Sequence, residues 1–156
     1  MTRTFLDAGI LISATTGRDD LFDRAWDILD DPERVFLSSD FVRLEVLPKA
    51  HYFHHQDEVD FYEMFFTEVA QIVPVSEVLI SQAHLEAQSA GLGALDALHV
   101  AAAKIRGAEE FVTTERSTTA LFRVMGLMIT KIRPIARSEA CPPSGDSRPK
   151  PASYGR

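Results

Sequence analysis

Four carboxylates, Asp7, Glu45, Asp96 and Glu115, stand in apolar stretches of the sequence, and carboxylate oxygen is the usual protein ligand of hard divalent ions. Asp7 closes Thr4-Phe5-Leu6, Glu45 lies within 41–47, Asp96 opens an Ala-rich segment and Glu115 follows 111–114. An acid with apolar neighbours is costly to desolvate unless a cation or several donors meet it. If the four converged they would repel one another, and a bound divalent ion is the simplest compensation.

The elements that must position these acids follow from apolar patterning and end signals. The sequence predicts strands near 3–7, 35–37, 72–75, 111–113 and 127–132. It predicts helices over 21–30, 41–47, 57–69, 77–90, 94–106 and 119–125. Pro48 is expected to end or bend the second helix, and Pro74 to place its strand at an edge or stop it early. Strands that alternate with helices or helix pairs predict an α/β sandwich around a parallel sheet.

In parallel α/β sheets, ligands bind beyond the carboxyl ends of the strands. Asp7 and Glu115 follow strands directly, so both are expected at that edge, and Asp96 lies in the first turn of a helix, where a carboxylate is favoured. Glu45, about two turns into a helix, would reach the same cleft over the helix edge. Each acid taken alone has an ordinary alternative, as a helix-start residue, a solvated helix face or a turn cap.

The four segments together resemble the signature blocks of PIN domains. The blocks are Leu6–Ile12, the helix of Glu45, Leu92–Ala102 and Val112–Arg116, and the resemblance covers about residues 2 to 135. It is closest to the VapC-like toxins of bacterial and archaeal toxin–antitoxin pairs. It implies a three-layer α/β/α sandwich with a central parallel sheet, a homodimer, and RNA cleavage with Mg²⁺ or Mn²⁺. Asp7, Glu45 and Asp96 match the metal-site acids of the family, whereas Glu115 stands where the family usually has Asp.

Two divalent ions can activate a water and stabilise the leaving oxygen of a phosphodiester without a covalent nucleophile. We expect Asp7 and Asp96 to ligate metal, Glu45 to ligate or to orient the water, and Glu115 to support a second ion. Thr113 and Ser13 are weaker candidates for polar support of the ligands. Arg116 is a weaker candidate for contact with phosphate, and His99 for a packed or supporting role.

A second group of possible ligands is the segment His51-Tyr52-Phe53-His54-His55. His51 and His55 have the i,i+4 spacing of a shared metal site, but no Glu follows His51 as in His-Glu-x-x-His. We therefore favour a solvated helix end. Most aromatic residues of 57–69 are expected in the core, and any surplus is expected to serve a dimer or an antitoxin segment.

Composition sets the remaining limits. A net charge of −7 argues against a broad nucleic-acid binder with a basic face, but bound cations would reverse the local sign at an acidic nuclease site. No apolar run approaches the ~18–20 residues of a membrane span, and no signal peptide is evident. The single Cys141 cannot form an internal disulfide, so a cytoplasmic location is expected. We expect a nuclease domain at 1–137 and a disordered tail at 138–156.

The leading hypothesis is thus a metal-dependent endoribonuclease, the toxin of a toxin–antitoxin pair, with RNA as substrate and an antitoxin as partner. One alternative is a catalytically weak PIN-like module that acts through RNA or protein binding. Another is a phosphatase-like hydrolase of small molecules, for which the sequence offers no substrate loop.

Overall fold

The computed structural model of the chain describes residues 1–16, 20–115 and 119–134. Its five strands are β1 (Thr2–Leu6), β2 (Arg34–Ser39), β3 (Gln71–Val73), β4 (Glu110–Thr113) and β5 (Met128–Lys131). Its helices are α1 (Ala8–Thr16), α2 (Asp20–Leu29), α3 (Asp40–Tyr52), α4 (Gln56–Glu68), α5 (Glu77–Ala90), α6 (Ala94–Ile105) and the 3₁₀ turn η1 (Ala120–Arg123). The predicted tail at 138–156, with Cys141, lies outside the described residues.

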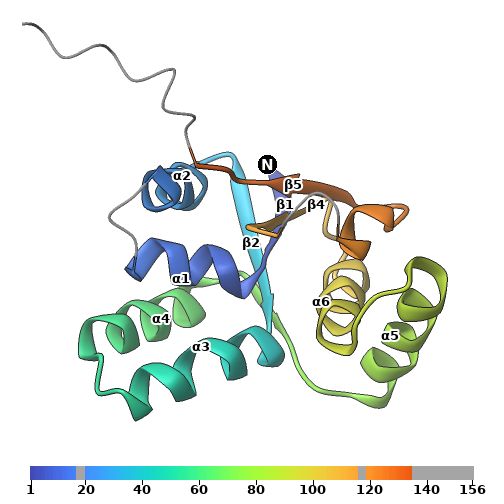
Figure 1. Ribbon diagram of the computed structural model, residues 1–156, viewed down its shortest axis with the longest axis horizontal. Coiled ribbons are helices and arrows are strands. Elements are labelled where there is room, and N and C mark those ends of the chain that lie inside the picture. The colour runs from blue at the N-terminus through green and yellow to red at the C-terminus, as the bar shows by residue number, and fades with distance from the viewer. Residues whose placement is uncertain (17–19, 116–118, 135–156) are drawn as a thin grey trace, which may run out of the picture.

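All neighbouring strands of the sheet are parallel, in the order β3-β2-β1-β4-β5. Figure 1 shows α1, α2 and α4 on one side of the sheet and α5 and α6 on the other, with α3 near the end of β2. The predicted α/β/α sandwich with a central parallel sheet is therefore confirmed. Because the strands are parallel, their carboxyl ends meet at one edge, where the segments that carry the acids begin.

Helix ends follow the predicted cap chemistry. Ser39 and Ser76 have extended backbones, and their hydroxyls accept the backbone N–H of Val42 and Leu79 at 3.3 and 3.2 Å. Gly91 ends α5 with a φ of 67°, in the left-handed region that favours glycine. Edge strand β3 stops at Val73, directly before Pro74, as the missing N–H of proline predicts.

Three elements differ from the sequence prediction. The helix α1, directly after Asp7, was not predicted, because Ala8–Thr16 is apolar on most sides and carries no helical stripe. The helix predicted to carry residues 41–47 is longer than expected, because α3 continues to Tyr52, and Pro48 lies inside it near its end. The predicted helix at 119–125 is only the short 3₁₀ turn η1.

The core lies on both faces of the central strands, where Phe5, Phe111 and Val112 are fully or almost fully buried. The rings of Phe5 and Phe111 stack with centroids 5.4 Å apart. Helix α6 presents a run of small residues, Ala101, Ala102 and Ala103, which are completely buried and allow it to lie close to the sheet. None of the described helices is long and apolar enough to cross a membrane.

Candidate metal centre

Asp7 is held at the carboxyl end of β1 by the neighbouring strand β4. Its backbone N–H donates to the carbonyl of Val112 at 3.0 Å, which continues the sheet hydrogen bonding by one residue. Its carboxylate accepts the hydroxyl hydrogen of Thr113 at 2.7 Å, and the Thr113 oxygen in turn accepts the backbone N–H of Glu115 at 3.0 Å. Thr113 therefore joins the end of β1 to the segment that carries Glu115.

Glu45 of α3 reaches the same place by a contact with α6. Its Oε2 lies 2.7 Å from Nε2 of His99, a side chain that is only 2% exposed. The other ring nitrogen, Nδ1, is buried and has no hydrogen-bond partner. An N–H at Nδ1 would be a buried unpaired donor, so we assign the hydrogen to Nε2, from which it is donated to Glu45.

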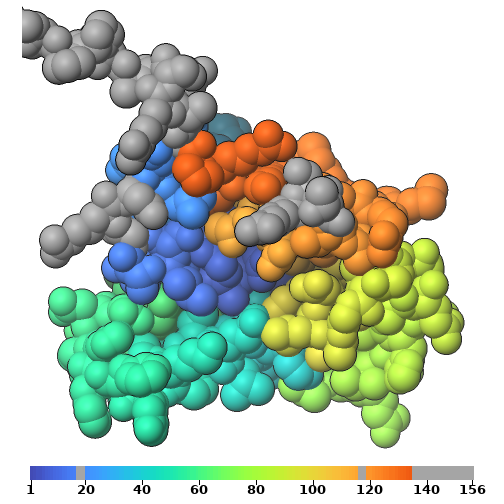
Figure 2. Space-filling model, viewed as in Figure 1, coloured from blue at the N-terminus to red at the C-terminus, as the bar shows by residue number. Residues whose placement is uncertain are grey.

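Asp7, Glu45 and His99 form one compact group. Each offers one ligand atom, and the three atoms lie within 4.8 Å of one another. These side chains come from the end of β1, from α3 and from α6, and Figure 2 shows α1, α3, α6 and the segment after β4 side by side on one face. Convergence of Asp7 and Glu45 agrees with the sequence prediction, although their function stays a prediction.

Asp96 and Glu115 lie outside this group of three. Asp96 is nonetheless close enough to Glu45 and His99 for their charges to shift the pKa of its carboxyl. Asp96 stands in the first turn of α6, one turn before His99, and it is half-buried. Burial raises the pKa of the Asp96 carboxyl, and the charges of Glu115 and Glu45 raise it further, against an opposing effect of His99. Glu115 is exposed, which fits a looser role than that of the other acids.

Burial is also the main influence on Asp7. It raises the pKa of the Asp7 carboxyl above the ordinary 3.8, while the Thr113 hydroxyl and the His99 ring oppose the shift and the charge of Glu45 adds to it. The protein thus disfavours the ionised form of an acid that it places beside other acids. Perturbation by burial and like charge is typical of functional sites.

Two buried acids elsewhere in the molecule have a lysine or arginine partner, whereas the described residues supply none to the acids at this edge. Glu110 pairs with Arg34, and Glu86 pairs with Lys104 at 2.7 Å. Among residues 1–16, 20–115 and 119–134, neither lysine nor arginine makes an ion pair with Asp7, Glu45, Asp96 or Glu115. The excess negative charge at the carboxyl edge therefore lacks a compensating side chain in the part of the chain that the structure describes.

Gly9 makes the close approach at this edge possible. A Cβ atom at Gly9 would lie 2.3 Å from Oγ1 and 3.4 Å from Cβ of Thr114, so no larger residue fits without movement. The first turn of α1 can therefore pack directly on the segment after β4. This contact could not be predicted from the sequence, because a glycine inside a helix gives no sign of what packs against it.

The weaker predictions have mixed outcomes. Thr113 contacts Asp7, whereas Ser13 is half-buried on α1 without a hydrogen bond to any of the acids, and Arg116 lies outside the described residues. The shared metal site of His51 and His55 is not formed. His55 lies beyond the end of α3, where its Nδ1 is 2.9 Å from Glu58, and no group of possible metal ligands includes either histidine within the described ranges.

Comparison with known proteins agrees with this arrangement. The sequence model of the PIN domain matches residues 4–120. The chain belongs to the PIN domain family. This PIN domain has no match among curated proteins at the sequence level.

Solved structures with this PIN fold include several toxin–antitoxin proteins. VapBC2 from Rickettsia felis, bound to a DNA fragment from its promoter, aligns with a TM-score of 0.64 and 16% identity, over 85% of this chain and all of that one. A toxin–antitoxin complex from Klebsiella pneumoniae aligns with a TM-score of 0.58 and 21% identity, over 74% of this chain and 88% of that one. VapC20 from Mycobacterium tuberculosis, a toxin that cleaves the sarcin–ricin loop, aligns with a TM-score of 0.56 and 17% identity. The alignment covers 69% of this chain and 86% of that one. At these identities the likeness is one of fold.

Proposed function

We propose that this PIN domain is a divalent-metal-dependent endoribonuclease that hydrolyses RNA phosphodiester bonds, and that it is the toxin of a toxin–antitoxin pair. The observation that carries the proposal is the convergence of Asp7 and Glu45 at an edge that supplies no compensating cation among the described residues. Asp96 lies close enough for the charges of Glu115 and Glu45 to raise the pKa of its carboxyl. A nuclease with metal ions needs such an anionic site, whereas a purely structural cluster would be stabilised by lysine or arginine.

The donor set fits Mg²⁺ or Mn²⁺. Carboxylate oxygens suit both ions, and the buried imidazole is already committed to Glu45 through its Nε2 hydrogen. Asp7, Glu45 and Asp96 would hold the ion, and Glu115 would support a second one. When bound, the ions neutralise charge on the phosphoryl oxygens and make a bound water more acidic.

The side chains around the ligands orient them. The Thr113 hydroxyl donates to Oδ2 of Asp7, and the backbone N–H of Ala8 also donates to this carboxylate. The His99 ring holds one oxygen of Glu45, so the Glu45 side chain is already ordered before an ion or a water binds. Binding therefore costs less conformational entropy. Glu115 is exposed and one methylene longer than Asp, and its charge lies close enough to Asp96 to raise the pKa of that carboxyl.

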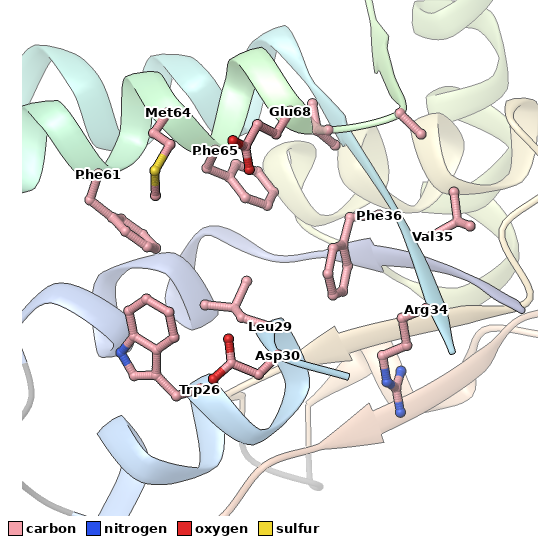
Figure 3. Close-up of a pocket in the computed structure, with 12 residues that line it drawn as sticks. Trp26, Leu29, Asp30, Arg34, Val35, Phe36, Phe61, Met64, Phe65 and Glu68 are labelled. Atoms are coloured by element: carbon pink, nitrogen blue, oxygen red, sulfur yellow. The ribbon is translucent and has the colours of Figure 1, made fainter. Parts of the chain in front are cut away.

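A separate pocket suits the antitoxin. It has a volume of about 450 Å³ and lies between α2, α4 and β2, away from the acids. Figure 3 shows Trp26, Phe61 and Phe65 around it, with Arg34 and Glu68 at its margins. Several neighbours in fold are complexes of toxin and antitoxin, and an aromatic pocket with a charged rim suits an amphipathic partner segment. Trp26 is the single tryptophan, so its fluorescence would report on that segment.

A homodimer is a further part of the proposal. Leu44 on α3 and Val78 and Leu85 on α5 are exposed apolar side chains. Exposed apolar surface of this kind is common at contacts between subunits. Light scattering over a range of protein concentrations would establish the oligomeric state. Leu44→Glu or Leu85→Glu should shift the equilibrium from dimer toward monomer.

Cleavage of a labelled single-stranded RNA tests the activity. We expect cleavage with Mg²⁺ or Mn²⁺, none with EDTA, and at least a 100-fold loss in Asp96→Asn, which removes one anionic ligand and keeps the side-chain shape. Asp57→Asn, an exposed acid at the start of α4, is the matched control and should cleave like the parent. If Asp96→Asn cleaves as fast as the parent, the acids are not the active site, and a binding module becomes the better account.

A further inference from the structure

One face of α3 leads away from the acids. Glu45, Lys49 and Phe53 are spaced by four residues, so they follow one another along the same side of α3 and its C-cap. At 1.5 Å per residue, Phe53 lies about 12 Å beyond Glu45 along the helix axis. The described residues give Lys49 no ion pair, and its side chain is exposed.

These three residues line one cleft. It has a volume of about 200 Å³ and lies between α1, α3 and the start of α4, with Ile12 and His55 among its other walls. Because Glu45 belongs both to this cleft and to the group with Asp7 and His99, the cleft adjoins the proposed metal centre. A polymer whose reacting phosphate lies at the acids would therefore extend along it.

Aromatic rings are displayed at the far end of the cleft. Tyr52 is 76% exposed and Phe53 60% exposed. Their rings meet edge to face with centroids 5.0 Å apart, and the ring of His55 lies 30° from that of Phe53 at 5.9 Å. Two adjacent exposed aromatic side chains leave a large apolar area in water, which a stacking ligand would cover.

The backbone holds these rings in place. His54 has a φ of 57°, the left-handed conformation that usually falls to glycine at a helix end. The N–H of His55 donates to the carbonyl of Ala50 at 3.0 Å, and the N–H of His54 to that of His51 at 3.1 Å. This hydrogen-bond pair is the Schellman arrangement, so Phe53 and His55 are presented by a fixed cap at the end of α3.

The net charge of the protein favours an aromatic contact over an electrostatic one. At −7, the chain gains little from general attraction to a polyanion, so affinity for RNA must come from local contacts. Stacking on aromatic rings needs unpaired bases, because the faces of paired bases are hidden within a duplex. Lys49, which lines the same cleft as Phe53, can contact one phosphate of such a strand.

We propose that the cleft between α1, α3 and α4 is a subsite for single-stranded RNA, in which a base close to the scissile phosphate stacks on Phe53 and a flanking phosphate contacts Lys49. The identity of the polymer rests on the proposed ribonuclease function, whereas the stacking does not require cleavage. The subsite would make the enzyme select unpaired regions irrespective of the particular base.

Binding without catalysis tests the subsite. A short single-stranded RNA that carries 2-aminopurine is titrated with the full chain in Ca²⁺, and an abasic oligonucleotide of equal length is titrated in parallel. Anisotropy gives Kd, and quenching of 2-aminopurine reports stacking. Phe53→Leu should weaken binding of the RNA about 5- to 100-fold and remove the quenching. It should leave binding of the abasic chain unchanged, and Phe53→Trp should keep both properties.

Met128→Ala, at an exposed apolar residue on β5 that has no part in the proposed metal centre or dimer contact, is the matched control and should bind like the parent. Equal Kd and quenching for the parent and Phe53→Leu would overturn the subsite, as would equal binding of the abasic and base-containing chains. A change confined to the subunit association of Phe53→Leu would also overturn it, in favour of a second copy as occupant. Stacking without any metal-dependent cleavage would leave the subsite standing and contradict the ribonuclease proposal instead.

Discussion

Glu45 and His99 are 54 positions apart in the sequence, yet their side chains form a hydrogen bond of 2.7 Å that joins α3 to α6 beside Asp7. The ring is buried and its other nitrogen has no hydrogen-bond partner, so Glu45 is the one polar contact of the ring among residues 1–16, 20–115 and 119–134. The bond fixes a carboxylate that would otherwise move freely on an exposed helix edge. We interpret His99 as the residue that positions Glu45 for a metal ion.

Substitution of His99 should separate positioning from packing. His99→Leu removes the donor and should weaken Mn²⁺ binding about 10–100-fold, the usual cost of losing a side chain that orients a ligand. His99→Gln retains an N–H donor and should recover most of the affinity. Calorimetric titration of Mn²⁺ into both variants provides the measurement, and equal affinity in His99→Leu and the parent would show that the contact is only structural.

Metal-free stability should depend on pH through Asp7. The pKa of Asp7 is raised in the folded state, so folded protein binds a proton more readily than unfolded protein, and stability falls as pH rises from about 3.8 through the raised pKa. In EDTA at neutral pH, Asp7→Asn should therefore melt a few degrees above the parent, and the difference should vanish below the unfolded pKa.

Mn²⁺ should reverse the order of the two melting temperatures. The ion stabilises the parent, whereas it binds more weakly to Asp7→Asn, which lacks one carboxylate. Thermal unfolding between pH 4 and pH 8, with and without the metal, follows both effects. A lower melting temperature for Asp7→Asn in EDTA at neutral pH would mean that the ionised carboxylate is already well compensated without metal.

Gly9→Ala should destabilise the protein although alanine favours helices. The new Cβ would meet Thr114 at 2.3 Å, and the resulting displacement should cost about 1–3 kcal/mol. Thr114→Ala removes the clashing oxygen, so the double variant should recover much of the loss. Urea unfolding of the parent, both single variants and the double variant gives the coupling energy, and strictly additive effects would exclude the contact as the cause.

Much of this arrangement could be predicted from the sequence, because Asp7, Asp96 and Glu115 lie at strand ends or a helix start, and the helix of Glu45 begins at a capping serine. Asp7 follows a short apolar run, and Ser39 caps the helix of Glu45. Helix α1 had no such signal, since its apolar residues lie on all sides and its β-branched residues suggest a strand.

Tertiary contacts account for the rest of the difference. The helix predicted to carry residues 41–47, with Pro48 near its end or bending it, continues to Tyr52, since Leu47 and Ala50 are buried on either side of the proline. The partnership of Glu45 and His99 depends on how α3 and α6 pack, which no local pattern encodes. The sequence named Thr113 and His99 as candidate supports, but it could not predict which acid each of them contacts.

Glu115 tests whether the site uses a second ion. If Glu115 supports one, Glu115→Gln should weaken metal binding about 10–100-fold, because it removes the charge that balances a divalent ion. Glu115→Asp should hold or raise activity, since the shorter acid matches the residue usual in the family. If the Gln variant binds Mn²⁺ and cleaves RNA like the parent, the centre rests on Asp7, Glu45 and Asp96 with one ion.

The most direct measurement is anomalous diffraction from crystals of the full chain soaked in Mn²⁺. The account predicts a strong anomalous peak among the carboxylates of Asp7, Glu45 and Asp96, and a second, weaker peak on the side of Glu115. The peaks should be absent in Asp96→Asn crystals treated in the same way. Crystals that diffract well after the soak but show no anomalous peak among these acids would contradict the assignment of a metal centre to this edge of the sheet.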